Sequence, residues 1–390
     1  MTEKLYYEDP HQQQFTAHVV SCAPGKHGYD VVLDRTCFYP EGGGQPGDSG
    51  ILCGRQPGDS GIRVTDTHER SGEIVHNCEA PLQIGAEVAA KIDYARRLAL
   101  MQLHSGEHIL SGLVHKHFGY ENVGFHMGAE FVTIDFNGML DEAQLAMLER
   151  EANEAVWKDL PITVSYPSAE ELKQIPYRSK KELNGQIRIV TIPGYDICAC
   201  CGTHVERTGE IGEIRIFSCV KFHEGVRLEI LCGQRAFDYV GALLMQNKQT
   251  STLLSAKPAE TAAAVQRLLE ENASLKLRCG QLESRLFAAK AAAMPPEGDA
   301  IVFEEGLTPD GVRRLTDALL RGRTGRAAVF SGTDETGYSY AVGENNGDLR
   351  ALTREMNARL NGRGGGKAGF VQGSVKAARA EIEEFWREQA

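Results

Sequence analysis

The sequence predicts an α+β protein of several domains, and three patterns carry that prediction. Short β-rich runs separated by Gly, Pro and Asp clusters fill the first 93 residues. Long helical periods interleaved with strand-like runs follow to about residue 245. A heptad repeat and a compact tail complete the 390 residues, a length that itself implies two to four folding units. We therefore expect a small N-terminal β-barrel, an α+β domain, a coiled-coil linker and a small C-terminal α/β domain.

The first predicted domain, residues 1–93, is the β-barrel. Runs such as YDVVL, GIRVTDT and EVAAKID have the composition and length of short strands, and turn-forming clusters separate them. The segment Gln45–Gly50 (QPGDSG) recurs as Gln56–Gly61, but the second copy lacks the FYPEGGG sequence that precedes the first. A duplicated turn is sufficient to explain the second copy, so we assign function to the first alone.

The second predicted domain, residues 94–245, begins with a long helix. Asp93 is a suitable N-cap, apolar residues recur at helical spacing, and Gly119 is a C-terminal stop. A second helix is expected over residues 141–158. Strand-like runs such as GAEFVTIDF, QIRIVTI and GVRLEIL lie between and after these helices. This mixture predicts an α+β domain.

A heptad repeat identifies residues 246–294 as a helical coiled-coil linker. An Asn at an a position is expected where the register or the number of partners must be specified. Two interpretations remain open: a coiled coil that forms a homodimer, or a helical spacer that folds back on its own domains. The heptad positions are Val265, Asn272, Cys279 and Leu286 at a, and Leu268, Leu275, Leu282 and Ala289 at d.

The last predicted domain, residues 295–390, differs from the rest in charge. Pro295 and Pro296 end the helix before it. Residues 300–390 hold 13 basic and 13 acidic side chains, so the whole net charge of −11 comes from the upstream residues, which hold 29 and 40. A basic face for an anionic partner is one interpretation, and a solvated helix face is the other. The basic candidates include Arg313, Arg314, Arg354, Arg363 and Lys367.

Composition excludes several classes of protein. A net charge of −11 is incompatible with a uniformly positive surface. The opening MTEKLYYEDPHQQQ has no apolar core or cleavage site, and no segment offers 18 uncharged apolar residues, so we expect neither export nor a membrane span. Ten cysteines, three of them within residues 198–201, indicate metal binding or burial better than disulfides in the reducing cytosol. The expected location is cytoplasmic.

Two short motifs predict a metal site. His104 and His108 are four residues apart in the first helix, which places both imidazoles on one face about a turn apart. Downstream, a cysteine and His204 lie in a Gly-bearing turn after a strand-like run. Three nitrogens and one sulfur form a borderline-soft ligand set that suits Zn²⁺. Spacing alone does not choose among the thiols Cys198, Cys200 and Cys201.

The same helix segment supports a competing enzyme class. His104–His108 (HSGEH) fits the H-x-x-E-H pattern of zinc metallopeptidases, with Glu107 as general base. The pattern is only five residues long, and no other motif supports it. The downstream cysteine and histidine supply soft ligation that such a peptidase does not need. We therefore keep the peptidase as the alternative.

With Asp34–Asp48 (DRTCFYPEGGGQPGD) added to the two metal motifs, the chain resembles the editing region of alanyl-tRNA synthetases and their free-standing AlaX relatives. The order and spacing of the motifs match over residues 1 to about 240. In that family, a barrel with a Gly-Gly-Gln signature packs on a zinc-bearing editing domain shared with threonyl-tRNA synthetases. The remainder, including the Gly-rich Asn361–Gly369, resembles the C-terminal part of alanyl-tRNA synthetase, which points to the large AlaX subtype.

The resemblance implies a trans-editing deacylase that removes serine, and more variably glycine, from mischarged tRNA(Ala). It implies Cys200, in Cys-x-x-x-His, as the thiolate ligand beside His104, His108 and His204. A zinc-bound water is the expected attacking group, with no side-chain base assigned. The alternative is that zinc only orders the pocket, while a bound water and the ribose hydroxyls carry out the proton transfers. A protein that binds tRNA without hydrolysing the ester is a further alternative. The implied substrate-binding residues are Thr36, which would contact the serine hydroxyl, and Gly43, Gly44 and Gln45, which would line the pocket.

The resemblance also gives residues 295–390 a role as a tRNA-binding or dimerisation domain. Arg313, Arg314, Arg354, Arg363 and Lys367 become the candidate tRNA contacts. The Gly-rich stretch is not a P-loop, because Lys367 is followed by Ala rather than Ser or Thr, so we expect no ATP site.

Overall fold

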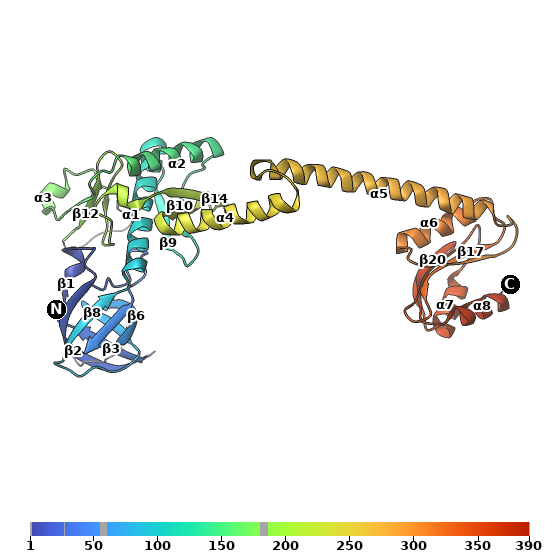
Figure 1. Cartoon of the computed structure of the whole chain (residues 1–390), viewed down its shortest axis with the longest axis horizontal. Helices are drawn as coiled ribbons and strands as arrows, with labels where there is room; N and C mark the ends of the chain where they lie inside the picture. The colour runs from blue at the N-terminus through green and yellow to red at the C-terminus, as the bar shows by residue number, and fades with distance from the viewer. Residues whose placement is uncertain (1, 27, 55–60, 180–185, 390) are drawn as a thin grey trace. The chain divides into compact units, whose positions relative to one another are not determined.

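The computed structural model describes residues 2–26, 28–54, 61–179 and 186–389 (Figure 1). The chain divides into two compact units, Met1–Asn247 and Lys248–Ala390. The first five residues of the repeated turn, Gln56–Ser60, lie outside the described residues. No helix in the described part of the chain has the length and apolar run needed to cross a bilayer.

The N-terminal part of the first unit is a closed antiparallel β-barrel of six strands, so the predicted barrel is confirmed. Along β2 (Gln14–Gly25) the residues alternate between exposed and buried before a bulge, as expected for a strand with one face on the core. The 3-10 turn Leu5–Tyr7 precedes the barrel. The other barrel strands are β3 (Gly28–Leu33), β5 (Gly50–Gly54), β6 (Ile62–Arg70), β7 (Glu73–Cys78) and β8 (Glu87–Ile92), and β1 (Glu3–Lys4) pairs outside it with β4 (Arg35–Thr36).

Helix α1 (Tyr94–Phe118) leaves the barrel and runs through the core of the unit. Asp93 caps its start by accepting a hydrogen bond from the Arg96 amide, and Gly119 ends it in the left-handed conformation at φ 68°. Every residue of 100–114 is buried. Both predicted helix boundaries are therefore confirmed, and His104 and His108 lie inside the protein instead of on an amphipathic surface helix.

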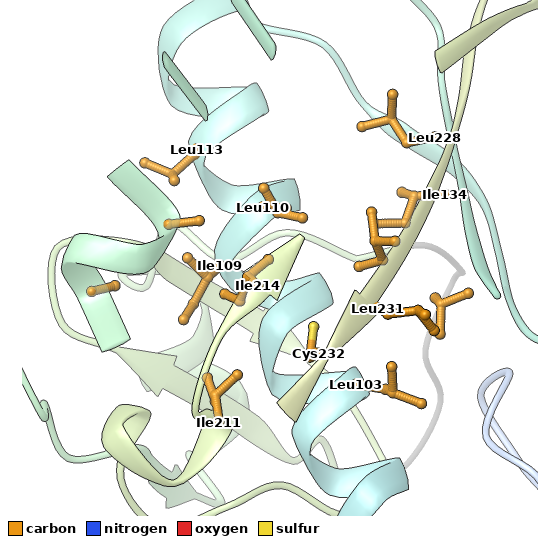
Figure 2. Close-up of a cluster of buried hydrophobic side chains, with 14 of the residues drawn as sticks. Leu103, Ile109, Leu110, Leu113, Ile134, Ile211, Ile214, Leu228, Leu231 and Cys232 are labelled. Atoms are coloured by element: carbon orange, nitrogen blue, oxygen red, sulfur yellow. The ribbon is translucent and has the colours of Figure 1, made fainter. Parts of the chain in front are cut away.

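Two sheets and further helices enclose α1. Figure 2 shows Leu103 and Leu110 of α1 among apolar side chains from the neighbouring strands. The four-stranded sheet has the order β14-β15-β10-β9 and the three-stranded sheet β11-β12-β13. The strands are β9 (Asn122–Met127), β10 (Val132–Phe136), β11 (Thr163–Ser165), β12 (Ile189–Ile192), β13 (Asp196–Ala199), β14 (Ile214–Phe222) and β15 (Gly225–Cys232); the helices are α2 (Glu142–Trp157), α3 (Ala169–Leu172) and α4 (Gly233–Leu253), with a 3-10 turn at Thr208–Ile211.

The second unit is a five-stranded sheet with helices on both faces, which agrees with the predicted α/β class. Ala327 and Val329 of β17 pack with α6, whereas Ala328 and Phe330 pack with α7 and α8. The strand order is β16-β17-β18-β20-β19, so β19 is an edge strand. The elements are β16 (Ala300–Glu304), α6 (Pro309–Leu320), β17 (Arg326–Thr333), β18 (Gly337–Glu344), α7 (Arg350–Arg359), β19 (Arg363–Lys367), β20 (Phe370–Val375) and α8 (Arg379–Glu388).

Helix α5 (Thr261–Ala292) contains all four predicted heptads in one uninterrupted helix, after a 3-10 turn at Pro258–Glu260. All eight heptad positions are exposed in the single chain. The buried residues of α5 are instead Ala264 and Phe287, and Phe287 joins the core beside α6. Within the second unit the heptad face is therefore not part of the core, and a coiled-coil pairing stays a prediction.

Candidate metal centre

Four buried or partly buried donors from two distant segments meet in the first unit. His104 and His108 come from α1, and Cys200 and His204 come from the turn that follows β13. Their ligand atoms all lie within 4.8 Å of one another. The structure therefore brings together the four residues expected to form the metal site, and Cys200 is the thiol in this cluster. Cys201 is exposed, and Cys198 groups separately with Asp196 and His108.

Local sequence explains why the two segments can approach so closely. The i, i+4 spacing on α1 aligns the two imidazoles, whose ring centroids are 5.2 Å apart. Gly202 then lets the ligand turn lie against His104, because a Cβ at that position would overlap the His104 ring. The glycine is thus required by close packing across the site, not by its backbone conformation.

His108 is oriented by a buried ion pair. Its Nδ1 lies 2.8 Å from Asp196 Oδ2, and Arg178 binds both oxygens of the same carboxylate at 2.8 and 2.9 Å. Burial opposes charge on His108, but the Cys200 thiolate and the bond to Asp196 raise its pKa well above the ordinary value. Because Nδ1 faces the carboxylate, Nε2 is the nitrogen left for the cluster.

His104 is oriented from the barrel. Its Nδ1 lies 3.1 Å from Gln45 Oε1, and its Nε2 lies 3.4 Å from the Cys200 sulfur. Gln45 also contacts Thr203, the residue beside the fourth ligand, through its amide nitrogen at 2.8 Å and its oxygen at 3.1 Å. Gln45 therefore lies at the cluster, as the family resemblance implied, but it is buried and bonded to protein groups.

The remaining two donors have the features expected of metal ligands. Both ring nitrogens of His204 are buried without any hydrogen-bond partner, a costly state for polar atoms unless something else binds them. Burial lowers the pKa of His204 to about 3, so the ring is neutral. Burial opposes ionisation of Cys200, but the neighbouring imidazoles hold its pKa well below the ordinary value and favour the thiolate. Three imidazoles and a thiolate form a donor set that fits Zn²⁺.

The Gly-rich turn lies against the same cluster. Gly42 and Gln45 exchange two backbone hydrogen bonds of 3.0 Å, and Gly43 and Gly44 between them have φ of 60° and 85°. Positive φ at both central residues is what a two-residue hairpin of this kind requires. A Cβ at Gly44 would meet Phe125, whose ring stacks 5.4 Å from His104. Gly43 and Gly44 are exposed, so the tip of the turn is open beside the donors.

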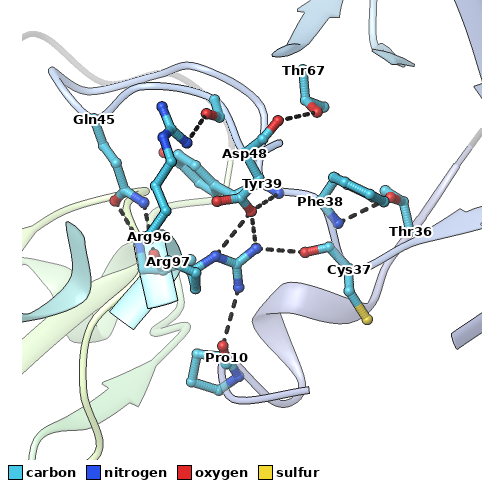
Figure 3. Close-up of polar contacts among 12 residues, drawn as sticks. Pro10, Thr36, Cys37, Phe38, Tyr39, Gln45, Asp48, Thr67, Arg96 and Arg97 are labelled. Carbon is cyan, nitrogen blue, oxygen red and sulfur yellow. Dashed lines mark hydrogen bonds and ion pairs between the residues drawn. The ribbon is translucent and has the colours of Figure 1, made fainter. Parts of the chain in front are cut away.

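The start of α1 holds this loop in place, as Figure 3 shows. The fully buried Arg97 binds the Asp48 carboxylate and donates to the Cys37 carbonyl at 2.5 Å. Asp48 also accepts the Tyr39 amide at 2.7 Å, and Arg96 donates to the Gly47 carbonyl at 2.6 Å. The loop that carries Gln45 is therefore tied to the helix that carries His104.

Thr36 is not among the four converging donors, and its expected contact with the serine hydroxyl stays a prediction. It is fully buried, and its hydroxyl donates to Nε2 of His76 at 2.8 Å while accepting from the Phe38 amide at 3.0 Å. His76 is fixed in turn because its Nδ1 donates to the Val31 carbonyl at 3.0 Å. The Thr36 hydroxyl is thus committed to bonds within the barrel.

The basic C-terminal residues fall into two groups. Arg313 and Arg314 on α6 form ion pairs with Asp310 and with Glu283 at 2.8 and 2.9 Å. Arg354, Arg363 and Lys367 form no ion pair with any residue that the structure describes. A groove of 680 Å³ between α7 and β19 is lined by Arg350, Arg354, Thr353 and Gly364–Gly366, among others.

Sequence reasoning missed the residues that orient the ligands. Asp196 and Arg178 belong to no motif of the chain, and Asp196 is 88 residues from the histidine it contacts. Thr203 lies within the Cys200–His204 motif, but its spacing assigned it no role. Glu107, the expected base of a peptidase, accepts hydrogen bonds from Ser111 and Asn122, both at 2.6 Å. Its carboxylate is not among the converging donors of the described residues.

Comparison with known proteins identifies the family. Residues 2–96 match the family model for tRNA synthetases class II (A), and residues 187–227 match that for the threonyl and alanyl tRNA synthetase second additional domain. The alanyl-tRNA editing protein AlaX-L of Pyrococcus horikoshii is 30% identical over 98% of this chain and 96% of its own length. The chain belongs to the AlaX-L family. The resemblance drawn from the motifs is therefore confirmed.

Alanine–tRNA ligases are similar to this AlaX-L family member over part of their length. The ligase of Natronomonas pharaonis is 32% identical over 95% of this chain, which spans 42% of the ligase. The ligase of Pyrobaculum calidifontis is 32% identical over 99% of this chain, which spans 44% of the ligase. The solved C-Ala domain from Aquifex aeolicus alanyl-tRNA synthetase matches 23% of the chain and 86% of that domain, with 22% identity and a TM-score of 0.21, which is too low to establish a shared fold.

Proposed function

We propose that this chain is a zinc-dependent deacylase that edits in trans by hydrolysing Ser-tRNA(Ala), with Gly-tRNA(Ala) as a second substrate, in the cytoplasm. The observation that carries the proposal is the convergence of His104, His108, Cys200 and His204 beside an open Gly-rich turn. The AlaX-L relative, which bears the name of an alanyl-tRNA editing protein, supports the substrate class.

The reaction divides between the metal and the residues that surround it. When bound, Zn²⁺ would supply a Lewis acid for the ester carbonyl and for a water molecule. Arg178 holds Asp196 ionised, and Asp196 keeps the proton of His108 on Nδ1. Phe125 covers one face of His104 and keeps water from it. Gly43 and Gly44 leave the backbone open for close approach of the 3′ end of the tRNA.

Specificity against alanine follows from unpaired polar groups. A polar group placed to bind the serine hydroxyl is left unsatisfied by alanine, at a cost of about 1 to 3 kcal/mol or roughly one to two decades of rate. Because Thr36 and Gln45 are already bonded within the protein, we assign this contact to a group exposed along the Gly-rich turn. Glycine also lacks the hydroxyl, so Gly-tRNA(Ala) should be hydrolysed more slowly than Ser-tRNA(Ala).

The second unit would hold the tRNA body. Arg354, Arg363 and Lys367 lie at or beside the groove between α7 and β19 and have no internal ion pair among the described residues. Phosphate contacts need such free cations. We therefore favour these three residues over Arg313 and Arg314. The exposed heptad face of α5 would pair two chains into a homodimer.

A comparison of substrates tests the proposal. Purified protein is mixed with Ser-, Gly- and Ala-tRNA(Ala) and with a peptide library, and release of the amino acid is followed. We expect fast release from Ser-tRNA(Ala), slower release from Gly-tRNA(Ala) and little from Ala-tRNA(Ala). Binding without release would favour a non-catalytic tRNA-binding protein, and cleavage of peptides would favour the metallopeptidase.

A further inference from the structure

We propose that Gln45 is a positioning residue through which the barrel assembles the metal site. In this role its single amide group joins both ligand-bearing segments, α1 and the turn after β13. The inference rests on the proposed function, in which the four donors hold zinc. It makes the barrel part of the zinc site, beyond any contact that the Gly-rich turn makes with tRNA.

The contacts of Gln45 are few and fully buried. Its Oε1 accepts from His104 Nδ1 and from the Thr203 amide, both at 3.1 Å, and its Nε2 donates to Thr203 Oγ1 at 2.8 Å. Gln45 is 0% exposed and Thr203 is 1% exposed. No water competes at such a site, so the three bonds have well-defined geometry. Thr203 directly precedes His204. The Gln45 side-chain amide therefore contacts one expected ligand, His104, and the residue next to another, His204.

The chemistry of an amide oxygen decides which histidine tautomer is present. A carbonyl oxygen can only accept, so His104 must carry its proton on Nδ1. The lone pair of Nε2 then points to the cluster, where Cys200 Sγ lies 3.4 Å away. The Asp196 carboxylate likewise places the proton of His108 on Nδ1, but Asp196 belongs to the same domain as His108. In the described structure, His104 is thus the ligand whose orientation depends on the barrel.

The 3-10 turn that precedes the barrel also contacts the ligand turn, which supports this interpretation. Tyr7 donates from its hydroxyl to the Cys201 carbonyl at 2.9 Å. Arg188 lies 5.0 Å over the Tyr7 ring and donates to the carbonyls of Cys200 and Gly202 at 2.8 and 3.0 Å. The turn that carries two ligands is therefore held by Tyr7 and Gln45 from the N-terminal residues and by Arg188 from its own domain.

Three substitutions separate hydrogen bonding from packing. Gln45→Leu keeps most of the side-chain volume but removes all three bonds, and we expect a 10- to 100-fold loss of zinc affinity, the usual cost of removing a partner of a ligating histidine. Gln45→Glu still offers acceptors to His104 and to the Thr203 amide, so its affinity should stay within a few-fold of wild type. Gln13→Ala, an exposed glutamine of the same part of the chain, is the matched control.

The measurement is zinc affinity of the full-length protein by competition with a chelator, together with the visible spectrum of the cobalt-substituted protein. We expect Gln45→Leu to lose affinity and to change the cobalt spectrum, and Gln45→Glu to restore both. Wild-type affinity in Gln45→Leu, or a loss that Gln45→Glu does not restore, overturns the inference. A wild-type protein that binds no zinc instead refutes the proposed function itself.

A second variant covers the case in which Gln45→Leu does not fold. Thr203→Val removes the acceptor of the Gln45 amide nitrogen and leaves His104 in contact with the carbonyl. Circular dichroism verifies its fold. A several-fold loss of zinc affinity supports the inference, and unchanged affinity contradicts it.

Discussion

At the scale of the residue, buried hydrogen bonds separate side chains that act at the cluster from those that hold the barrel. Gln45 and Thr36 both stand in the segment that carries the family resemblance, and both are fully buried. Only Gln45 contacts one of the four converging donors, His104, whereas the Thr36 hydroxyl is bound by His76 and the Phe38 amide. Motif matching alone cannot distinguish these two outcomes.

Replacement of Thr36 tests that distinction. Thr36→Val leaves His76 Nε2 and the Phe38 amide without a partner, so we expect a loss of about 1 to 3 kcal/mol in the free energy of unfolding. The ratio of Ser-tRNA(Ala) to Ala-tRNA(Ala) hydrolysis should not change. Denaturant unfolding and the two hydrolysis rates check this, with the exposed Thr16→Val as control. A selective rise in Ala-tRNA(Ala) hydrolysis would return Thr36 to the substrate pocket.

Acid should destabilise the barrel through His76. Burial lowers the pKa of this residue from 6.5 to about 4. The unfolded chain therefore binds a proton below pH 6.5 while the folded barrel stays neutral, so stability falls as the pH falls from 6.5 to about 4. The total loss is about 3 kcal/mol. Unfolding free energies measured across this range should fall less steeply for His76→Gln, and equal slopes would contradict the assignment.

At the scale of the element, local signals predicted α1 and its ends, but not what surrounds it. Asp93 and Gly119 mark the helix because capping depends on neighbouring residues. The proximity of His104 to His108 is likewise local, because it follows from their i, i+4 spacing. That of Cys200 to His204 follows from the Gly-bearing turn between them. The contacts of Asp196 and Gln45 cannot be predicted from local sequence. Asp196 is 88 residues from His108, and Gln45 is 59 residues from His104. The heptad of α5 predicted a helix but not its buried residues, Ala264 and Phe287.

The ligand turn should tolerate no side chain at Gly202. A methyl group there would overlap the His104 ring and approach Gln45 Oε1, so Gly202→Ala must displace one segment of the site. We expect at least about 10-fold weaker zinc binding and about 1 to 3 kcal/mol lower stability. Gly241→Ala, at an exposed helical position with nothing nearby, should leave zinc affinity unchanged. Wild-type zinc affinity in Gly202→Ala would show that the turn is not packed as described.

At the scale of the whole molecule, charge and chemistry are divided between two units. The metal cluster and the Gly-rich turn belong to the unit that ends at Asn247, and the neutral C-terminal residues to the other. The sequence predicted the uneven charge correctly. It did not predict which arginines are free, because ion pairs such as that of Arg314 with Glu283 depend on the packing of α5 against α6.

The division predicts separate effects on binding and hydrolysis. Replacing Arg354, Arg363 and Lys367 together by Ala should weaken tRNA binding. It should also make the slope of the log binding constant against log salt concentration less steep, by about one for each phosphate contact removed. The rate at saturating Ser-tRNA(Ala) should change little. The paired Arg313→Ala and Arg314→Ala variant is the control. Equal loss of affinity in both variants would mean that α6 also contacts the tRNA.

The central claim is that the four converging donors hold the zinc on which editing depends. Zinc content and single-turnover hydrolysis of Ser-tRNA(Ala) are measured on the same samples of wild type, Cys200→Ala and the exposed neighbour Cys201→Ala. We predict one zinc per chain and full hydrolysis in wild type and Cys201→Ala, and loss of both in Cys200→Ala. Wild-type hydrolysis by a folded, zinc-free Cys200→Ala protein would contradict the account.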